Sequence, residues 1–599
     1  GQTSQFALTS ADRIEVLKGP IASLYGNASG GVLQVFTRSP GDKPELIVAD
    51  TVGSYGLNHK NIQYSEKRGD IGIVVDSSNF KSDGFRQWSA AEREHLNAKI
   101  EFSSESQKVT LIANYLDNKN TQDPGTLNLS NYQSNPYAVQ TGLPNISKKY
   151  GKSFTQGVYG LVFEGRIDST AGYGFRVYSG DRNFVGAAAD YSVIDRKFMG
   201  TALDVSKQTS IGGIPVKFLA GLEYDYMKDL RLAYANSSGN MGSTVLRDED
   251  NIAANQGGYI QSQWALSGNY TGMLGLRYTR VNLQVKDRYT AGGDIDGSGS
   301  KTYSGLSPVI GLTHHLDEFT NLYGQFGRGF ETPTLNEVLY INTSNEENGY
   351  SNKFDSSVSA SKSNQFELGF KSRPSRSTKF DGAVFYAKTS NDIVPNITRV
   401  TGSTWTNAVT EKYGIELGGQ YVTEQNISLR GAITAISAKY DEATTNASLG
   451  NRLPGIPQAQ AYIDIAWRTA DWFIKPKVTF SELGVDVKYV GKTYVDSRNS
   501  YTYTAGGSSV EILNANSITT KDYAVVGARV AQNYKAGPHA LTLFGRVDNI
   551  FDQKYVSSVV VNQSSSRYYE PGMPRNWIVG MKYSLALNCF IAIANGSYQ

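Results

Sequence analysis

Residues 216–226 read VKFLAGLEYDY, and in this stretch apolar or aromatic side chains alternate with others that include Lys217, Glu223 and Asp225. Alternate side chains of an extended strand point to opposite faces of a sheet. The same alternation recurs in residues 365–371 (QFELGFK), 415–421 (IELGGQY), 485–489 (VDVKY) and 576–585 (NWIVGMKYSL). One face of each predicted strand is therefore apolar, and the other face can meet water.

The connections between these predicted strands fall into two classes. Short polar turns lie at residues 67–70, 103–107, 266–269, 315–318, 371–377, 423–426 and 535–538. Long irregular segments lie between them, at residues 118–156, 229–255, 286–302, 328–362, 391–410, 493–517 and 550–571. Barrels of outer membranes have short turns at one end and longer loops at the other, and a count from residue 46 to residue 585 gives about 22 strands. We therefore predict an all-β fold, a closed transmembrane antiparallel β-barrel.

The composition agrees with a β protein and excludes several other classes. The chain has 599 residues, with 38 Tyr and 61 Gly against 17 Pro and one Cys, a balance that suits strands and turns. Cys589 is the only cysteine, so no disulfide can form within the chain. The net charge of +3 does not suggest nucleic-acid binding. The sequence has no apolar run of about 18 residues, so a transmembrane helix is not expected.

A soluble propeller is the alternative all-β architecture, because it also consists of many short strands and turns. A propeller would show a sequence repeat of roughly 40 to 50 residues. The chain shows no such repeat, which favours the barrel.

Residues 1–43 differ in character from the predicted barrel. Residues 13–20 read RIEVLKGP, an alternating strand that ends at Gly19 and Pro20, and residues 32–37 have the pattern of a return strand. The glycines of the LYG (24–26) and GGV (30–32) segments provide bends, and no helix pattern follows that would indicate a phosphate site. The residues alone predict a compact β segment.

These motifs closely resemble the end of the plug domain of TonB-dependent outer-membrane receptors. The far end agrees, because VDNIFDQKY (547–555) and EPGMPRNW (570–577) are similar to the final strands of that family. SDGFR (82–86), GFETPT (329–334) and LPGIP (453–457) resemble motifs of its siderophore-receptor branch. The plug motif residues are Arg13, Glu15, Gly19, Pro20, Tyr25, Gly26, Gly30 and Gly31.

The resemblance implies three parts of the chain. Residues 1–43 are expected to be the C-terminal part of the plug, lying inside the barrel, and residues 44–585 the transmembrane barrel. Residues 586–599 follow the last strand as an atypical tail, whereas family members usually end on an aromatic residue. A family plug is much longer than 43 residues, so we expect an N-terminally truncated plug without its TonB box.

The resemblance also implies a function, namely uptake of a ferric siderophore or similar iron complex through the outer membrane of a Gram-negative bacterium. The implied partners are the siderophore, outer-membrane lipid and lipopolysaccharide, and TonB with its inner-membrane energising complex, for a monomeric receptor. Cobalamin, a copper complex or an oligosaccharide are alternative cargoes. Haem is disfavoured, because no histidine occurs between His315 and His539. A passive porin, or a barrel for adhesion or phage docking, is the alternative of a different class.

Candidate ligand-binding residues are aromatic and cationic side chains in the predicted loops. Arginine and tyrosine could supply charge-assisted hydrogen bonds and stacking to an anionic ferric chelate with planar groups. Barrels also place aromatic residues in interfacial girdles, and loop arginines can face lipopolysaccharide, so only the set is suggestive. The candidates are Arg86, Trp88, Tyr132, Arg231, Tyr234, Tyr340, Arg399, Trp405 and Tyr568, with Tyr137, Tyr350, Arg567 and Tyr569 beside them.

No pattern in the chain indicates catalysis, a resident metal or a cofactor, so we do not expect an enzyme. The five histidines form no HExxH motif, and His314 and His315 border a predicted turn. Residues 294–299 match the start of a calcium loop, but its twelfth position is Gly305 rather than glutamate, which favours a flexible loop.

Overall fold

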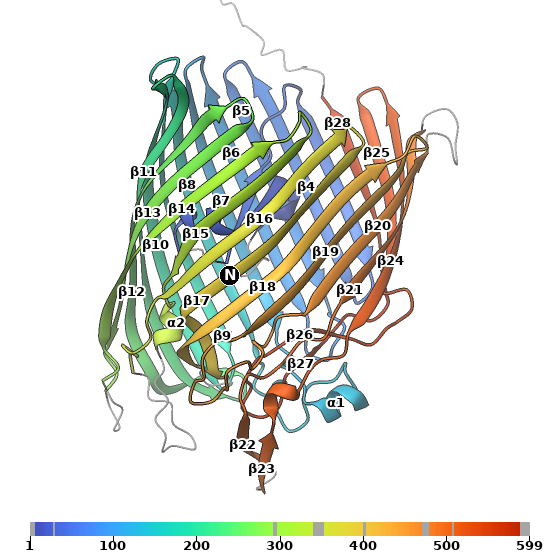
Figure 1. Ribbon diagram of the computed structural model, residues 1–599. Helices are drawn as coiled ribbons and strands as arrows, with labels where there is room; N and C mark the ends of the chain where they lie inside the picture. The colour runs from blue at the N-terminus through green and yellow to red at the C-terminus, as the bar shows by residue number, and fades with distance from the viewer. Residues whose placement is uncertain are drawn as a thin grey trace, which may run out of the picture.

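The computed structural model describes residues 6–27, 30–290, 296–339, 353–398, 403–469, 478–505 and 508–587. Within them the chain forms a closed barrel of 22 antiparallel strands, as predicted (Figure 1). The barrel strands are β3 (Glu45–Gly53), β4 (Leu57–Arg68), β5 (Ile71–Ser82), β6 (Ala91–Ser103), β7 (Gln107–Gln122), β8 (Gly151–Arg166), β9 (Ala171–Ala187), β10 (Asp190–Ile211), β11 (Ile214–Ser237), β12 (Asn240–Ser267), β13 (Tyr270–Asp287), β14 (Gly299–His315), β15 (Thr320–Glu331), β16 (Ser361–Ser375), β17 (Thr378–Ile397), β18 (Thr404–Val422), β19 (Ile427–Tyr440), β20 (Ala459–Thr469), β21 (Val478–Val490), β24 (Tyr523–Ala536), β25 (His539–Asp548) and β28 (Asn576–Ala586).

The first and last barrel strands close the ring. β28 pairs antiparallel with β3, with Ala586 opposite Glu45 and Ile578 opposite Gly53. Closure gives every strand two hydrogen-bonded neighbours, so no sheet edge is left to pair with another chain. The barrel runs from Glu45 to Ala586, close to the predicted limits of residues 44 and 585.

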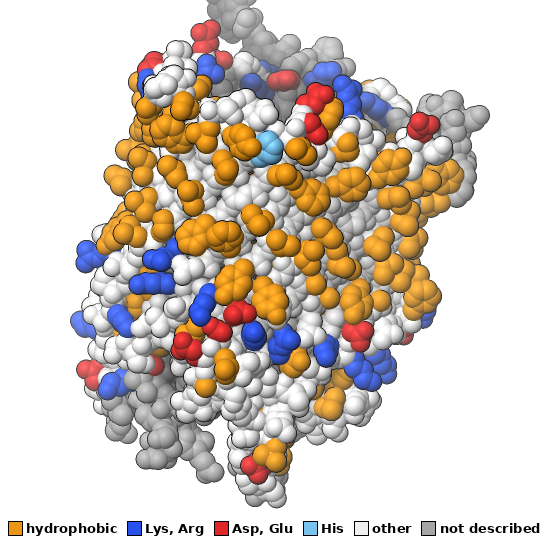
Figure 2. Space-filling model, in the orientation of Figure 1, with side chains coloured by type: hydrophobic (Ala, Val, Ile, Leu, Met, Phe, Trp, Pro, Cys, Tyr) orange, Lys and Arg blue, Asp and Glu red, His pale blue; other side chains and the backbone are white. Residues whose placement is uncertain are grey.

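The alternation in the sequence separates an outer face from an inner face. On β16, Phe366 and Leu368 point outward and are each 53% exposed, whereas Glu367 between them accepts hydrogen bonds inside the barrel from Tyr323 (2.9 Å) and Gln325 (3.0 Å). Figure 2 shows the apolar side chains as a broad band on the wall, with charged side chains below it, toward the end that carries β22 and β23, and others at the opposite rim. An outer face of this kind suits lipid rather than water.

The two ends of the barrel differ, as the turn lengths predicted. One end has tight turns, and the other carries α1 (Leu129–Ser134), α2 (Leu335–Val338), η4 (Ala515–Ser517) and two small sheets (Figure 1). These sheets pair β22 (Ser500–Ala505) with β23 (Ser508–Leu513), and β26 (Val556–Val559) with β27 (Tyr569–Pro571). We call this second end the loop end.

Two predicted loops are wrong, because residues 229–255 continue the strands β11 and β12 and most of residues 391–410 belong to β17 and β18. The first of them shows the reason. Ser238 and Gly239 have φ values of +52° and +82°, the left-handed conformations that close a tight hairpin. The polar side chains that indicated a loop pair across strands instead, as Asp229 does with Arg196 at 2.7 Å and Lys228 with Asp250 at 3.3 Å. The polar side chains of residues 229–255 therefore belong to a hairpin that projects from the loop end, and not to an irregular loop.

The segment before the barrel forms a small sheet of its own. β1 (Ala11–Leu17) pairs antiparallel with β2 (Val32–Thr37), and the 3₁₀ turns η2 (Leu8–Ser10) and η3 (Pro20–Tyr25) flank β1. η2 packs against β5, and η3 packs against β13 to β16, so the segment contacts separate parts of the inner wall. We call residues 6–43 the plug segment. A two-stranded sheet is marginal alone, and these wall contacts supply the packing that it needs.

Candidate functional site

Arg277 on β13 ties the plug segment to the inner wall. Its side chain is only 1% exposed, and its guanidinium donates to the Leu24 carbonyl oxygen at 3.2 Å and to Thr279 Oγ1 at 3.0 Å. It also forms an ion pair with Glu223 on β11. Gly26 has φ +101°, and a Cβ there would lie 3.0 Å from Arg277 Nη2. The glycine therefore allows the plug backbone to turn directly over the guanidinium.

Further polar contacts join the plug segment to other strands. Thr9 donates to Asp76 on β5 at 2.7 Å, and Lys18 forms a 2.9 Å ion pair with Glu416 on β18. At the loop end, the Thr332 backbone N–H donates to the side-chain oxygen of Asn27 at 2.7 Å. The segment is therefore held to well-separated parts of the wall by side-chain hydrogen bonds.

A cavity of about 580 Å³ lies between the plug segment and the wall. The plug contributes residues 16–20 and 30–33, and the wall contributes residues of β15 to β19. Glu331 and Ser361 are among the lining residues, and they are the last residue of β15 and the first of β16. Since these strand ends lead into loops, this part of the lining lies toward the loop end. Its size lies in the range of small-molecule sites, roughly 300–1,000 Å³.

The cavity combines hydroxyl groups with paired charges. Ser361, Ser363 and Thr389 contribute hydroxyls, and Thr389 donates to Ser363 at 3.1 Å. Lys412 forms a 2.8 Å ion pair with Asp392, as Lys18 does with Glu416. The plug side adds the backbone of Gly19 and Gly31, whose φ values are +73° and +131°. Such a surface offers hydrogen bonds to a polar solute and no reactive nucleophile with an adjacent base.

A buried cluster of four side chains organises the loop end, and we call it the loop lock. Asp496 is 0% exposed and accepts from Arg498 Nε at 2.9 Å and from the Tyr568 hydroxyl at 2.8 Å. Arg498 lies over the ring of Tyr501 at 3.7 Å, and Tyr501 is on β22. Burial raises the pKa of Tyr568, and Asp496 raises it further, so this hydroxyl stays protonated as a donor.

A family model described as TonB dependent receptor-like, beta-barrel, matches residues 62–550. The chain belongs to the TonB-dependent receptor family. Curated relatives agree with this membership. The metal-pseudopaline receptor of Pseudomonas aeruginosa is 22% identical over 96% of this chain and 80% of its own length. The ferrichrome outer membrane transporter/phage receptor of Escherichia coli is 23% identical over 91% of this chain and 76% of its own length.

Solved receptor structures share the fold. The unliganded ferric citrate transporter FecA superposes with a TM-score of 0.77 at 18% identity, covering 97% of this chain and 84% of that one. The siderophore receptor PiuA from Acinetobacter baumannii gives 0.76 at 13% identity, covering 96% and 86%. These comparisons show the same fold, at identities that establish fold alone.

Several of the predicted ligand residues hold the loops of this receptor together. Arg86 donates to the carbonyl oxygens of Gly125 (2.7 Å) and Ala138 (3.0 Å), and burial lowers the pKa of its guanidinium. The indole of Trp88 donates to the Tyr150 carbonyl oxygen at 2.7 Å. These side chains therefore contact protein rather than the cavity. Tyr132 on α1 stacks on Tyr569 at 5.8 Å, and Tyr568 belongs to the loop lock.

The other candidates are spread over the loop end. Arg231 on β11 lies 3.9 Å from Glu249, Tyr234 is half-buried on the same strand, and Trp405 is half-buried on β18 opposite Pro395. Tyr340, Tyr350 and Arg399 lie outside the described residues. The structure thus brings none of the described candidates into the lining of the cavity, and ligand contact by any of them stays a prediction.

The plug motif residues have local roles that the structure makes visible. Arg13 and Glu15 form a 2.7 Å ion pair on β1, and Gly19 and Pro20 begin η3. Tyr25 ends η3 and is followed by Gly26, the glycine that faces Arg277. A Cβ on Gly31 would lie 2.9 Å from the Leu17 carbonyl oxygen, so this position requires glycine, whereas a Cβ on Gly30 would meet open space.

The metal candidates give no site among the residues that the structure describes. No group of three or more His, Cys, Asp or Glu side chains there could hold a metal ion. His315 contacts Thr271 at 2.9 Å, and His314 stacks on Tyr270 at 4.5 Å. Residues 294 and 295 of the calcium-loop candidate (294–299) lie within the gap at 291–295, and in its described part Asp296 accepts a hydrogen bond from the Ser298 backbone N–H at 2.9 Å. In the described part of the chain, no helix is long and apolar enough to cross a membrane.

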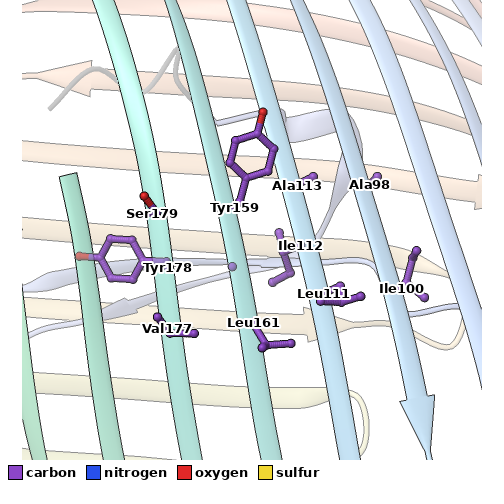
Figure 3. Close-up of a pocket in the computed structure, with 11 residues that line it drawn as sticks. Ala98, Ile100, Leu111, Ile112, Ala113, Tyr159, Leu161, Val177, Tyr178 and Ser179 are labelled. Carbon is purple, nitrogen blue, oxygen red and sulfur yellow. The ribbon is translucent and has the colours of Figure 1, made fainter. Parts of the chain in front are cut away.

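A hollow on the outer wall must be distinguished from the internal cavity. Figure 3 shows it over β6 to β9, lined by Ile100, Leu111, Tyr159, Leu161 and Val177 among others. Leu111 is 40% exposed and Tyr159 is 58% exposed, and both point away from the barrel interior. This surface is exposed on the outside of the wall and offers almost no polar groups.

Proposed function

We propose that this receptor takes up a ferric siderophore, or a similar iron complex, across the outer membrane of a Gram-negative bacterium. The carrying observation is the closed barrel with the plug segment bound to its inner wall, in a chain that belongs to the TonB-dependent receptor family. The names of the relatives support the cargo class, because ferrichrome, metal-pseudopaline and rhizobactin are named as their ligands. Passage past the plug requires that the plug contacts rearrange.

We further propose that TonB, with its inner-membrane complex, supplies the energy for that rearrangement. The plug segment is held by several hydrogen bonds and ion pairs, among them those of Arg277, Lys18 and Thr9. Breaking such a set together costs several kcal/mol, because hydrogen bonds to charged groups contribute about 1.5–3 kcal/mol each. Siderophore binding alone would then leave the plug in place.

Lipid and lipopolysaccharide are the proposed surroundings of the barrel. The outer apolar band suits acyl chains. Ion pairs such as Lys388 with Asp441 (2.6 Å) lie toward the loop end, since Asp441 directly follows β19. Phosphate groups of lipopolysaccharide can exchange with the carboxylates of such pairs. A closed barrel without a free sheet edge is consistent with a monomer.

The test is uptake of radioactive iron by cells that produce the receptor from its natural gene. We expect siderophore-bound iron to enter cells with TonB and to fall to background in otherwise identical cells that lack TonB. A passive porin would take up iron equally in both strains, and an adhesion or phage-docking barrel would take up none in either. Parallel assays with cobalamin, a copper complex and an oligosaccharide would identify a different cargo.

A further inference from the structure

The plug segment is bonded to itself near its two ends. The Arg38 backbone N–H, directly after β2, donates to the Ser10 carbonyl oxygen in η2 at 2.8 Å. We call residues 9–10 and 37–41 the neck of the plug segment. The chain between these two parts, which contains β1, η3 and β2, is therefore a loop that is closed at its neck.

A buried carboxylate of the wall binds the first side of the neck. Asp76 on β5 is 0% exposed, and one of its oxygens accepts a hydrogen bond from Thr9 Oγ1 at 2.7 Å. Asn61 and Gln63, both on β4, donate to its other oxygen at 2.8 and 3.1 Å. Because the carboxylate is buried, loss of the Thr9 hydroxyl would leave an oxygen of Asp76 without this donor, which is unfavourable. The contact therefore holds η2 firmly on the wall.

The second side of the neck is bound to the neighbouring strands. The Arg38 guanidinium donates to Gln63 Oε1 at 2.8 Å and forms a 2.5 Å ion pair with Glu45, the first residue of β3. The Gly41 backbone N–H donates to Ser65 Oγ on β4 at 3.1 Å, and Ser65 is buried. Gln63 links the two sides of the neck, because its amide also donates to the buried carboxylate on β5.

The far end of the plug segment lies against another part of the wall. η3 packs against β13 to β16, where Arg277 donates to the Leu24 carbonyl oxygen. The ion pair of Lys18 with Glu416 is open to solvent, since the two side chains are 60% and 34% exposed. β2 has six residues, so the neck and η3 are roughly 20 Å apart along the strand. A small rotation about the neck therefore displaces η3 by a much larger distance than the neck itself.

We propose that Asp76 is a positioning residue for transport. It fixes the neck on β4 and β5 while the rest of the plug segment turns about this point, so that a passage opens between η3 and strands β13 to β16. The covalent chain favours the same pivot, because residues 42–44 connect the neck directly to β3, and η3 reaches β3 only through β2 and the neck. This inference rests on the proposed function, in which the plug contacts rearrange, and adds which contacts stay and which open.

Two pairs of introduced cysteines test the pivot, in the full-length protein with its natural Cys589 replaced by serine. The neck pair is Thr9→Cys with Asp76→Cys, at positions whose side chains are already in contact. The far pair is Leu24→Cys with Gly275→Cys, because a Cβ on Gly275 would lie 3.4 Å from Leu24 Cγ. Cells with TonB are supplied with radioactive iron as ferrichrome, ferric citrate and a ferric tris-catecholate, and uptake is measured with and without dithiothreitol.

We expect the two pairs to respond to the reductant in opposite directions. The disulfide of the far pair should lower uptake at least about tenfold, which corresponds to about 1.4 kcal/mol, and dithiothreitol should restore it. The disulfide of the neck pair should leave uptake at the natural level, because it replaces the hydrogen bond between Thr9 and Asp76. Dithiothreitol should then lower uptake by this variant, since the reduced pair lacks the carboxylate. The single-cysteine variants are the matched controls, and their uptake should not depend on the reductant.

Two further measurements and the possible outcomes complete the test. Alkylation of free thiols verifies each disulfide, and heat-dependent mobility in SDS gels verifies that each barrel is folded. Loss of uptake in the oxidised neck pair would overturn the pivot, because the neck would then have to leave the wall. Natural uptake by the oxidised far pair would show that no passage opens beside η3, and equal uptake in both states of the neck pair would remove Asp76 as the positioning residue. If the natural protein imports iron from none of the three chelates, the proposed function itself fails.

Discussion

Replacing Arg277 with alanine is expected to release the plug segment from the wall while the barrel still assembles. The change removes the donors to Leu24 and Thr279 and leaves the carboxylate of Glu223 without its ion-pair partner. Removing one partner of a buried ion pair costs about 3–5 kcal/mol. We therefore expect faster proteolysis of residues 6–43 and greater entry of a large antibiotic such as vancomycin into cells.

Arg280→Ala is the matched control, because Arg280 lies on the same strand but is exposed. Adding Glu223→Gln to Arg277→Ala should restore part of the protection, since it removes the charge that the first change leaves unpaired. Equal proteolysis and antibiotic entry in Arg277→Ala and the natural protein would show that the plug is held by its other contacts alone.

Replacing Asp496 with alanine is expected to loosen the loop end with an effect of similar size. Arg498 is 4% exposed, and it would lose both of its hydrogen bonds to this carboxylate. Tyr568 would lose the acceptor for its hydroxyl. The buried charge of Arg498 would then be uncompensated, which costs about 3–5 kcal/mol. We expect this cost to lower the free energy of local unfolding at the loop end. Hydrogen exchange should therefore rise in β22, β23 and the segment around Tyr568.

The size of the response should follow the chemistry of the loop lock. Tyr568→Phe removes only the hydroxyl that donates to Asp496. The loss of one donor to this buried acceptor should lower the free energy of local unfolding by about 1–3 kcal/mol. Glu511→Gln, on an exposed position of β23, should leave exchange unchanged. If the Asp496→Ala variant is as well protected from hydrogen exchange as the natural protein, then β26, β27 and the neighbouring loops hold this region without the buried charge pair.

The wall of the barrel could be predicted because the alternation of apolar and polar residues along a strand is a local property of the sequence. Alternation at Phe366, Glu367 and Leu368 specifies which side chains point out of the barrel and which point in, and the structure has this arrangement. The same reasoning failed at residues 229–255, where polar side chains satisfy one another across a hairpin. Polarity alone does not distinguish a long projecting hairpin from a loop. The dipeptide Ser238-Gly239 was the sequence feature that could have indicated the turn, and both of its residues adopt the left-handed conformation.

The cavity could not be predicted, because its lining comes from separate strands and the plug. Ser363, Thr389 and Lys412 are ordinary inward polar positions in the sequence, and only the barrel register brings them together. Conversely, Arg86 and Trp88 are residue types that are typical of a ligand site, yet both donate to backbone carbonyl oxygens of other loop residues. Long loops need such anchors, since their own backbone cannot be satisfied locally.

The pairing of β3 with β28 has a consequence for how the chain could be cut and rejoined. Ala586 lies opposite Glu45, so the two ends of the barrel sequence are neighbours at the end with the tight turns. In a ring of antiparallel strands no strand is first or last by geometry. A permuted gene that joins these ends and opens the chain at Gly69 or Gly537, both in tight turns, would keep every hydrogen-bonded pairing of the wall. The plug segment, which continues into β3 through residues 38–44, is what gives this ring a beginning.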